Sequence, residues 1–506
     1  MKASSRAVVI GSGFGGLAAA VRLRARGYRV TVLEARDQPG GRAGVFRTGG
    51  YTFDAGPTVI TAPWLLDELF EMVGRDARDY FDLVPVDPFY RILFHDGSRF
   101  DFVGDDERLL AQIEAMEPRD VDGYRRLAER AREIFDVGYT ELGDRPFLRV
   151  RDMLRVAPDI VRLGGHRSVY SLVSRYLRDE RLRQVFSFEP LLVGGNPFRT
   201  SGIYLLIHWL ERKWGVHYAL GGTTSIVSGL VRLLEEIGVD VRLSSPVASI
   251  DVDAGRAVAV RTESGERIDC DVVVSNADPS VVYTRMLPSA QRARNTDARV
   301  RRRRQSMSLV VAYFGARRTW PELAHHTIVM GPRYRGLLDD IFVRRRLAED
   351  FSLYLHAPTR SDASMAPEGH EAFYVLSPVP NNRSGIDWPA EGERYVDRIL
   401  EHLERRLLPG LGAHLDVRFH VTPDYFEHEL RSMHGAAFGL EPLLTQSAWF
   451  RYHNRSPDVP NLFFVGASTH PGGGVPGVIT GARVLDRVVP APASAEPIPL
   501  RRARAG

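Results

Sequence analysis

Cysteine is almost absent from this chain of 506 residues, and Cys270 is the single one. One cysteine excludes internal disulfides and any metal site built from cysteines alone, and it fits a reducing compartment. No uncharged apolar run approaches the ~18 residues that a membrane-spanning helix needs. Met1–Arg6 leads directly into an apolar run without the pattern of a secretory signal. We therefore expect a cytoplasmic protein, soluble or peripherally bound to a membrane.

An excess of charge of one sign is also lacking. The 67 basic and 63 acidic residues leave a formal net charge of only +4, although the computed pI is about 9.1. So small an excess does not argue for nucleic acid as a partner. No Ser/His/Asp arrangement and no metal-ligand spacing stands out, so we predict no metal site. His166, His208 and His217, each isolated in a helical region, are more typical of structural histidines.

The first thirty-odd residues predict a β-α-β unit. Ala7–Ile10 is a short apolar run typical of a buried parallel strand, Phe14–Arg26 has helical spacing, and Arg29–Leu33 predicts a second strand. At this length, two intertwined domains are expected, and the unit belongs to an α/β domain.

A glycine-rich loop joins the first strand to the helix. Its residues are Gly11, Gly13, Phe14, Gly15 and Gly16, which include the pattern G-x-G-x-x-G. Glycine at these places permits a tight turn, close approach of a pyrophosphate and close packing of helix on strand. Glu34 ends the second strand, where a carboxylate can hold the ribose hydroxyls of an adenine nucleotide. The unit predicts dinucleotide binding, without separating NAD from FAD.

Two further loops favour FAD. Gly40–Gly41–Arg42 follows Glu34 closely and would bring a guanidinium to the phosphate oxygens. Tyr51–Thr58 (Y-T-F-D-A-G-P-T) brings another glycine-containing loop to the same region. A nicotinamide enzyme does not usually need these additional loops.

The stretch Asn461–Arg483 predicts a second strand-loop-helix unit near the C-terminus. The apolar run Leu462–Val465 ends at Gly466, a glycine-rich loop follows, and Pro476–Gly477–Val478 opens a helix. Such a unit directs backbone N–H groups and the positive end of a helix to one point. Two such units, one near each end of the chain, predict one cofactor held from two sides.

Between these units the pattern predicts three further groups of elements. A hairpin is expected over Ile92–Phe102, a mostly helical region from about Asp105 to Trp214, and an amphipathic helix over Thr223–Ile237. The remaining predictions are strands at Val239–Leu243, Val247–Val252, Ala257–Thr262 and Val272–Ser275, strands of a second sheet at Ser308–Phe314, Phe351–His356 and Ala372–Val379, and a helix over Glu391–Leu407.

The whole set of motifs resembles the bacterial-type phytoene desaturases and their carotenoid-desaturase relatives. The resemblance is carried by the segments G-x-G-x-x-G, E-x-R, G-G-R, Phe53–Thr61, Arg151–Arg155 (R-D-M-L-R), Leu191–Phe198, Phe438–Arg451 and Asn461–Arg483, and it covers roughly residues 6 to 489. It implies FAD as the redox cofactor and dehydrogenation of a long polyene hydrocarbon. It also implies a Rossmann-like FAD-binding domain with an interleaved substrate and lid domain, in a monoamine-oxidase-like architecture.

We expect a discontinuous FAD-binding domain from residues 1–90, 220–290 and 440–490. Residues 91–219 and 291–439 would form the substrate-binding and helical lid region. The tail over 491–506, rich in Pro and Ala, is expected to be disordered.

Within the FAD site we assign separate parts to the C-terminal unit. Gly466 and Ala467 would lie along the ribityl and phosphate chain, and Gly477 and Val478 would face the redox edge of the ring, where negative charge grows as hydride is accepted. Val247, at the start of a predicted strand, is expected to contact the cofactor as well.

The resemblance also implies a catalytic acid and arginine in the R-D-M-L-R helix, which here are Asp152 and Arg155. Desaturation removes a hydride from one carbon and a proton from its neighbour, so a proton acceptor, or a carboxylate that stabilises a transient cation, is useful. The i, i+3 spacing of the two residues would equally make an ordinary surface ion pair.

A hydrocarbon without polar groups must be recognised by apolar burial in a long tunnel. The candidate tunnel residues are Phe186, Phe188, Leu191, Leu192, Phe198, Tyr204, Trp209, Trp449 and Phe450. Gly202–Leu210 could lie in a membrane interface, and the basic run Arg299–Arg304 could contact anionic headgroups or be a solvated loop.

The expected activity is stepwise desaturation of phytoene toward lycopene, with quinone or oxygen as the final electron acceptor. The alternatives within the family are a diapophytoene or other carotenoid desaturase, a carotenoid isomerase and a ketolase. More distant alternatives of the same fold are an amine oxidase and a non-enzymatic isoprenoid carrier. The carrier would be colourless, whereas an enzyme of this family would be yellow with flavin.

Overall fold

A five-stranded parallel sheet forms the core of one half of the molecule. The computed structural model describes residues 5–498, and the sheet has the order β19-β13-β1-β2-β9. Its strands are β19 (Leu462–Phe464), β13 (Val272–Ser275), β1 (Arg6–Ile10), β2 (Arg29–Leu33) and β9 (Asp240–Arg242). All of them come from the three segments that the sequence assigns to the FAD-binding domain. The domain boundaries themselves stay a prediction.

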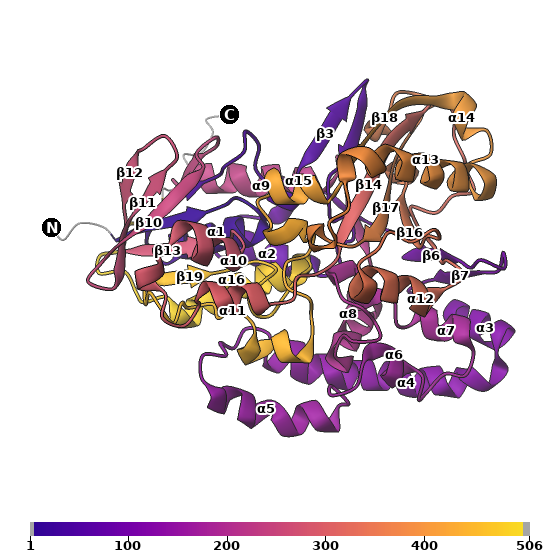
Figure 1. The fold of residues 1–506 in the computed structure, drawn as a ribbon, viewed down its shortest axis with the longest axis horizontal. Coiled ribbons are helices and arrows are strands. Elements are labelled where there is room, and N and C mark those ends of the chain that lie inside the picture. The colour runs from indigo at the N-terminus through magenta and orange to yellow at the C-terminus, as the bar shows by residue number, and fades with distance from the viewer. Residues whose placement is uncertain (1–4, 499–506) are drawn as a thin grey trace.

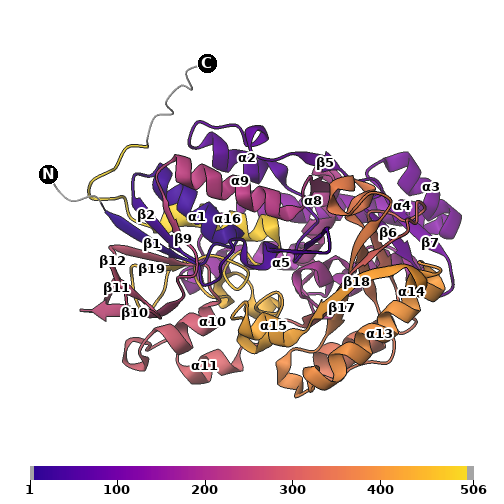
Figure 2. The same ribbon diagram turned by 90° about the horizontal axis from the view of Figure 1, so that it is seen from above.

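Both faces of this sheet are covered, which explains the apolar runs Ala7–Ile10 of β1 and Val272–Val274 of β13. On one face, Ala7 and Val9 of β1 pack with the helices α1 (Phe14–Ala25), α2 (Pro63–Glu71), α9 (Thr223–Glu236) and α16 (Val475–Val488). On the other face, Val8 and Ile10 pack against the antiparallel sheet of β10 (Val247–Asp253), β11 (Arg256–Thr262) and β12 (Arg267–Asp269) and against α10 (Pro279–Val281). Figure 2 shows α1, α9 and α16 together on their side.

A seven-stranded mixed sheet forms the other half, with the order β18-β14-β17-β16-β15-β6-β7. Its strands are β18 (Leu415–Val421), β14 (Ser308–Ala316), β17 (Glu371–Val379), β16 (Leu353–His356), β15 (His326–Val329), β6 (Tyr90–Leu93) and β7 (Arg99–Phe102). The hairpin predicted over residues 92–102 is β6–β7, and the three predicted strands of the second sheet are β14, β16 and β17. In Figure 1 this sheet stands on the right, beneath α13 (Trp388–Arg406).

The strand β14, paired between β18 and β17, presents alternate residues to two different environments. Val310, Ala312 and Phe314 pack against the helix α13 in a closed core. Leu309 and Val311 point to the opposite side, toward the first half of the molecule. Because side chains alternate along a strand, one side of β14 packs in the closed core and the other side can line a cavity.

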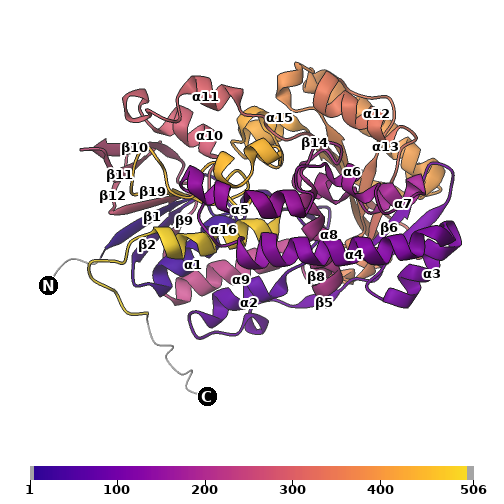
Figure 3. The same cartoon turned by 90° about the horizontal axis from the view of Figure 1, so that it is seen from below.

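Helices from the middle of the chain lie along one side of both halves, as Figure 3 shows. They are α3 (Asp106–Met116), α4 (Val121–Phe135), α5 (Val150–Arg162), α6 (Val169–Val173), α7 (Glu180–Val185) and α8 (Leu206–Trp214). The remaining elements are the strands β3 (Val45–Thr48), β4 (Tyr51–Asp54), β5 (Leu83–Pro85) and β8 (His217–Ala219) and the helices α11 (Asp297–Arg302), α12 (Tyr334–Asp339), α14 (Leu411–His414) and α15 (Pro423–His428). Within residues 5–498, no helix combines the length and the apolar character needed to cross a membrane.

The segment Gly202–Leu210, which the sequence suggested for a membrane interface, lies inside the molecule. Leu205 and His208 are fully buried, and Gly202 and Leu210 are buried as well. Its apolar residues therefore serve internal packing, and this part of the prediction is wrong.

The first residues of the tail make hydrogen bonds to the first β-α-β unit. The Glu496 N–H donates to the Gly27 carbonyl at 2.8 Å, and Arg24 donates to the carbonyls of Glu496 and Pro497. The Ala493 N–H donates to the Ser5 hydroxyl at 2.9 Å. These bonds place Ala493, Glu496 and Pro497 beside the first β-α-β unit, and the expected disorder of the tail stays a prediction. Residues 499–506 lie outside the described part of the chain.

Candidate active site

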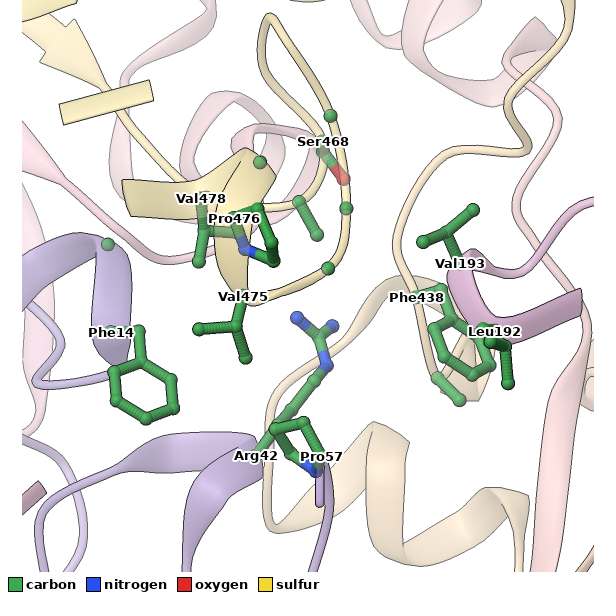
Figure 4. Close-up of a pocket in the computed structure, with 18 of the residues that line it drawn as sticks. Phe14, Arg42, Pro57, Leu192, Val193, Phe438, Ser468, Val475, Pro476 and Val478 are labelled. Carbon is green, nitrogen blue, oxygen red and sulfur yellow. The ribbon is translucent and has the colours of Figure 1, made fainter. Parts of the chain in front are cut away.

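One cavity of about 580 Å³ lies between the two halves. It is lined by the glycine loops of the first half and by the inner side of the seven-stranded sheet. Figure 4 shows Phe14, Val475 and Pro476 on one side of this space and Leu192 and Phe438 on the other. The two strand-loop-helix units that the sequence places at opposite ends of the chain therefore meet at one site.

The N-terminal glycine loop has the geometry expected for close approach of a phosphate group. Gly11 has φ of 91°, a conformation that side chains rarely adopt. A Cβ atom on Gly16 would lie 2.0 Å from the Gly11 carbonyl oxygen, so only glycine permits α1 to pack this closely on the turn. Gly11, Gly13, Phe14 and Gly15 line the cavity. Gly16 does not line the cavity, but it permits the close packing of α1 on which the positions of these residues depend.

Glu34 organises this loop as well as facing the cavity. Its Oε2 accepts hydrogen bonds from the Ser12 N–H at 2.8 Å and the Ser12 hydroxyl at 2.7 Å, and its Oε1 accepts from the Arg36 N–H at 3.0 Å. The carboxylate is thus held rigidly at the end of β2. Oε1 can still accept another hydrogen bond, which suits a predicted ribose hydroxyl.

Arg42 is a half-buried cation, and it makes no ion pair within residues 5–498. Its Nη2 donates to the Ser432 hydroxyl at 2.8 Å, while its Nε is buried without a partner among residues 5–498. Desolvation lowers the pKa of Arg42 from its usual value. Figure 4 shows the guanidinium pointing into the cavity. A half-buried, incompletely paired guanidinium fits an anionic ligand such as a pyrophosphate, so the residues present suit the predicted FAD.

Asn276 is a site residue that the sequence analysis missed. It follows β13, and its side-chain amide lies between two glycine loops: a Cβ atom on Gly13 would lie 2.7 Å from Nδ2, and one on Gly466 would lie 3.0 Å from Oδ1. The predicted strand Val272–Ser275 did offer a signal. The carboxyl ends of parallel strands meet at one edge of a sheet, where nucleotides bind.

The C-terminal loop is held in place by Arg451. This buried guanidinium donates to the carbonyl oxygens of Thr469 at 3.1 Å, Gln446 at 3.1 Å and Leu440 at 3.3 Å, and also to that of Ala467. Four carbonyl partners fix the course of the loop that begins at Gly466. Gly466 and Ala467 both line the cavity, as does Val247.

The start of α16 differs in one detail from the prediction. Gly477 and Val478 both line the cavity, but the Val478 N–H already donates to the Gly474 carbonyl at 3.0 Å. No hydrogen bond from the Gly477 N–H to a neighbouring loop is found in the described chain. Pro476 lacks an N–H. Gly477 is therefore the residue of this pair that can offer its N–H to developing negative charge.

The wall opposite the glycine loops is mainly apolar. Leu309 and Val311 of β14 contribute to it, together with Met153, Val156 and Ile160 of α5. Of the tunnel residues predicted from the sequence, the lining includes Phe188, Leu191, Leu192 and Tyr204. The lining does not include Phe186, Phe198, Trp209, Trp449 and Phe450. Phe186, Phe198 and Trp209 belong to or pack on the neighbouring core instead.

Several polar groups in this wall are hydrogen-bonded to one another or deeply buried. The Thr58 hydroxyl lies 2.9 Å from the Tyr354 hydroxyl and 2.8 Å from that of Tyr374. Glu211 accepts a hydrogen bond from Tyr90 at 2.7 Å, and burial raises its pKa well above the usual value. Charged residues also line the cavity, among them Asp159, Glu429 and Arg431, so an apolar molecule fits along the aliphatic part of the wall.

Asp54 is the exception within the F-D-A-G-P-T loop, because it titrates near neutral pH. Its Oδ1 accepts a hydrogen bond from the Thr223 N–H at 2.7 Å. Burial raises the pKa of Asp54 to about 7, and the bond from Thr223 only partly opposes this shift. Asp54 lines the cavity.

We predict that this residue makes the protein less stable as the pH rises. An aspartate in an unfolded chain has a pKa of about 3.9, so the stabilising contribution of Asp54 is complete below that value and is lost as the pH rises to about 7. The difference of about 3 units corresponds to at most about 4 kcal/mol.

Asp54→Asn should remove this term, since the amide stays neutral and its oxygen still accepts from Thr223. In urea unfolding, the variant should gain stability relative to the native protein between about pH 5 and about pH 8. An equal pH dependence of both proteins would show that Asp54 is not the group responsible.

The structure places the two predicted catalytic residues outside the cavity lining. The Asp152 Oδ2 accepts a hydrogen bond from the Arg149 N–H at 2.9 Å and so caps the start of α5. Arg155 is exposed on the same helix. Neither residue is among those that line the cavity. Their catalytic assignment stays a prediction, and the capping bond gives Asp152 a structural role of its own.

Comparison with known proteins supplies the remaining observation. Residues 14–488 match the family model of the flavin containing amine oxidoreductases. The chain is 49% identical to a lycopene-forming phytoene desaturase of Pantoea ananas, over 94% of this chain and 97% of that protein. It is 44% identical to a neurosporene-forming phytoene desaturase of Cereibacter sphaeroides, over 96% of this chain and 95% of that protein. The fold is also similar to that of cyclohexylamine oxidase from Brevibacterium oxydans, with a TM-score of 0.59 at 16% identity, covering 96% of this chain and 99% of that one.

Proposed function

The chain belongs to the phytoene desaturases within the flavin-containing amine oxidoreductase family, and from this premise we propose that it desaturates phytoene stepwise toward lycopene. The observation that carries the proposal is a single cavity that joins the dinucleotide loops to an apolar wall. Relatives at 48–49% identity that cover nearly their whole length are named as lycopene-forming. Those named as neurosporene-forming stand at 43–44%, so lycopene is the favoured end product.

Bound FAD supplies the hydride acceptor for such a reaction. The residues of this chain would bind and orient it: Arg42 would hold the phosphates and Glu34 the ribose, and the Gly477 N–H would stabilise negative charge at the redox edge. Leu309 and Val311 hold the hydrocarbon by apolar contact, worth roughly 25 cal/mol per Å² removed from water. The same walls keep water away from the reacting carbons.

The alternative activities differ in what they demand of the cavity. An amine oxidase acts on a polar substrate, whereas here the wall opposite the glycine loops is mainly apolar, and burial raises the pKa of Glu211 well above its usual value. A carrier of isoprenoids needs no flavin, yet the half-buried guanidinium of Arg42 fits an anionic cofactor. An isomerase, a ketolase or a diapophytoene desaturase would share both features, so product analysis must separate them.

The experiment that tests the proposal is expression of the chain in cells that supply phytoene, followed by chromatography of the pigments. We expect neurosporene and lycopene to accumulate. The matched control is Gly16→Ala, which should lack the cofactor and leave phytoene unchanged. Phytoene that persists in cells containing flavin-loaded protein would refute the proposed activity.

The catalytic assignment of Asp152 and Arg155 needs variants that separate capping from chemistry. Asp152→Asn keeps an oxygen that can cap α5 and removes the charge, whereas Asp152→Ala removes both. We expect the alanine variant to be less stable by about 0.5–2 kcal/mol. If Asp152 is catalytic, both variants lose turnover at native flavin content. Turnover that survives in Asp152→Asn would leave only the structural role.

We propose that the outer side of α5 docks on a membrane, where a hydrocarbon such as phytoene is dissolved. Val150, Leu154 and Val161 are exposed by 49%, 67% and 61%. The opposite side of the same helix lines the cavity through Met153 and Val156. One helix thus separates an exposed apolar surface from the substrate cavity, which supports entry of substrate at this place.

Basic residues surround this surface. Arg149, Arg151 and Arg155 are exposed along α5. Arg303, within the basic run at 299–304, donates to the carbonyl of Phe450 at 2.6 Å, and Phe450 is itself 38% exposed. The segment that contains Phe450 packs against α5. Such charges suit anionic headgroups, at about 1 kcal/mol for each charge near the surface.

Leu154→Glu should weaken flotation with anionic liposomes by about tenfold or more, since it places a carboxylate in the apolar interface. Val343→Glu is the matched control, because Val343 is also an exposed apolar residue, at 58%, but lies outside α5. Equal flotation of the two variants would mean that α5 is not the docking surface. A native protein that stays in the soluble fraction at low salt would contradict membrane docking altogether. The final electron acceptor, quinone or oxygen, remains part of the proposal.

A further inference from the structure

Three buried histidines gather beside the cavity wall, in the seven-stranded sheet. His326 begins β15 and lies directly opposite His356 of β16 in the antiparallel register, and His325 immediately precedes β15. Cross-strand partners stand side by side on one face of a sheet. His326 and His356 are fully buried, and His325 is 4% exposed. One nitrogen of each ring can be chosen so that all three lie within 4.8 Å of one another.

Two ring nitrogens in this group have no partner. The Nε2 of His325 lies 3.0 Å from the Nε2 of His356. The Nε2 of His326 and the Nδ1 of His356 are buried and make no hydrogen bond within residues 5–498. Leaving a buried polar atom unsatisfied is costly, and native structures rarely do so without a bound water or ion. Two such atoms in one group of imidazoles indicate that the group binds a ligand.

Partners on the far side of two rings orient the remaining nitrogens. The Nδ1 of His325 lies 2.7 Å from the Ser361 hydroxyl, and the Nδ1 of His326 lies 2.7 Å from the Tyr354 hydroxyl. Histidines that bind a metal characteristically use one nitrogen for the ion and the other for an oxygen partner that fixes the tautomer and the ring. Burial lowers the pKa of all three histidines. They are therefore neutral at physiological pH, as metal ligands must be.

We propose that His325, His326 and His356 form a binding site for one zinc ion. A set of three imidazoles without thiolate favours zinc among the common cations, and water or hydroxide completes the usual four ligands. With four ligands in a tetrahedron, Zn–N bonds of about 2.0–2.1 Å place two nitrogens about 3.4 Å apart. The most distant pair must therefore approach by up to about 1.4 Å, through rotation of the rings and a small shift of β15 relative to β16.

The site would act on the cavity through Tyr354. With zinc on its Nε2, His326 must carry its proton on Nδ1 and donate to the Tyr354 oxygen. Tyr354 can then donate to Thr58, whose hydroxyl also contacts Tyr374. Tyr354, Thr58 and Tyr374 all line the cavity. The ion would thus fix the direction of the hydrogen bonds in the only hydroxyl cluster that we find in the described apolar wall, and would tie β15 to β16.

The experiment measures zinc in the intact, flavin-loaded protein. Because the site is buried, the ion must enter during folding, so cells are grown with added zinc and the protein is purified without chelator. Zinc is then determined by mass spectrometry in the native protein and in His326→Gln and His356→Gln. His208→Gln is the matched control, since His208 is equally buried but lies outside the group. Flavin content reports folding of each variant.

We expect one zinc per chain in the native protein and in His208→Gln, and less than a tenth of that in the other two variants at unchanged flavin content. Native protein without zinc above background would overturn the proposal and leave a buried water as the occupant. Zinc that persists in both His326→Gln and His356→Gln would overturn it equally. If these variants fail to fold, the native protein decides: zinc that bound elsewhere would be removed by dialysis against a chelator, whereas buried zinc would stay. The zinc readout is independent of the carotenoid products.

Discussion

Val311→Trp should abolish desaturation while the protein keeps its flavin. Val311 lies in the centre of β14, faces the cavity and is 5% exposed. Its neighbours Val310 and Ala312 face the closed core beneath α13, so the added indole projects into the cavity and not into the packed side of the strand. A hydrocarbon displaced by about 1 Å from the redox edge already loses about 100-fold in rate.

The measurement is carotenoid production per bound flavin, compared with Val343→Trp. Val343 is also a valine but is exposed on the surface, so Val343→Trp should retain the native rate. A native rate in Val311→Trp would mean that the hydrocarbon does not lie along β14. Loss of flavin from this variant would instead indicate that the cofactor extends further into the cavity than the glycine loops suggest.

Gly16→Ala should leave the protein without bound flavin. A Cβ atom at this position would lie 2.0 Å from the carbonyl oxygen of Gly11, which is backbone and cannot rotate away. Relief requires that α1 move away from the turn, and this displaces Gly13 and Gly15 from the cavity. We expect affinity for flavin to fall by about 100-fold or more, or about 3 kcal/mol.

Flavin absorbance per protein measures this effect directly. Gly412→Ala is the control, since its Cβ would approach only the flexible carboxylate of Glu404, at 3.2 Å. That variant should be as yellow as the native protein. A fully yellow Gly16→Ala protein would contradict the assigned role of the N-terminal loop.

The five-stranded sheet and its loops were predictable because their signals are local. Short apolar runs such as Ala7–Ile10 indicate strands buried on both faces, and the glycines that follow mark turns that no other residue permits. The long apolar strand β14 and the amphipathic helix α13 were predictable for the same reason, since the pattern of each is contained in one segment.

The missed features depend on contacts between distant segments. His325 and His326 meet His356 only because β15 and β16 pair in one particular register, which the sequence does not specify. The membrane prediction for Gly202–Leu210 was wrong because an apolar run has the same sequence pattern whether it packs inside the protein or faces lipid. Backbone groups of Glu496 and Pro497 in the tail bond to Gly27 and Arg24, and the composition of the tail could not reveal those partners.

The most direct test of the account is to mix the flavin-loaded protein with phytoene in anionic liposomes under exclusion of oxygen. The account predicts that the absorbance of oxidised flavin is lost on mixing, and that a carotenoid with a longer conjugated system appears in equal amount. With Val311→Trp both changes should be absent. Flavin that stays oxidised, with phytoene recovered unchanged, would contradict the central claim that this cavity brings the hydrocarbon to the cofactor.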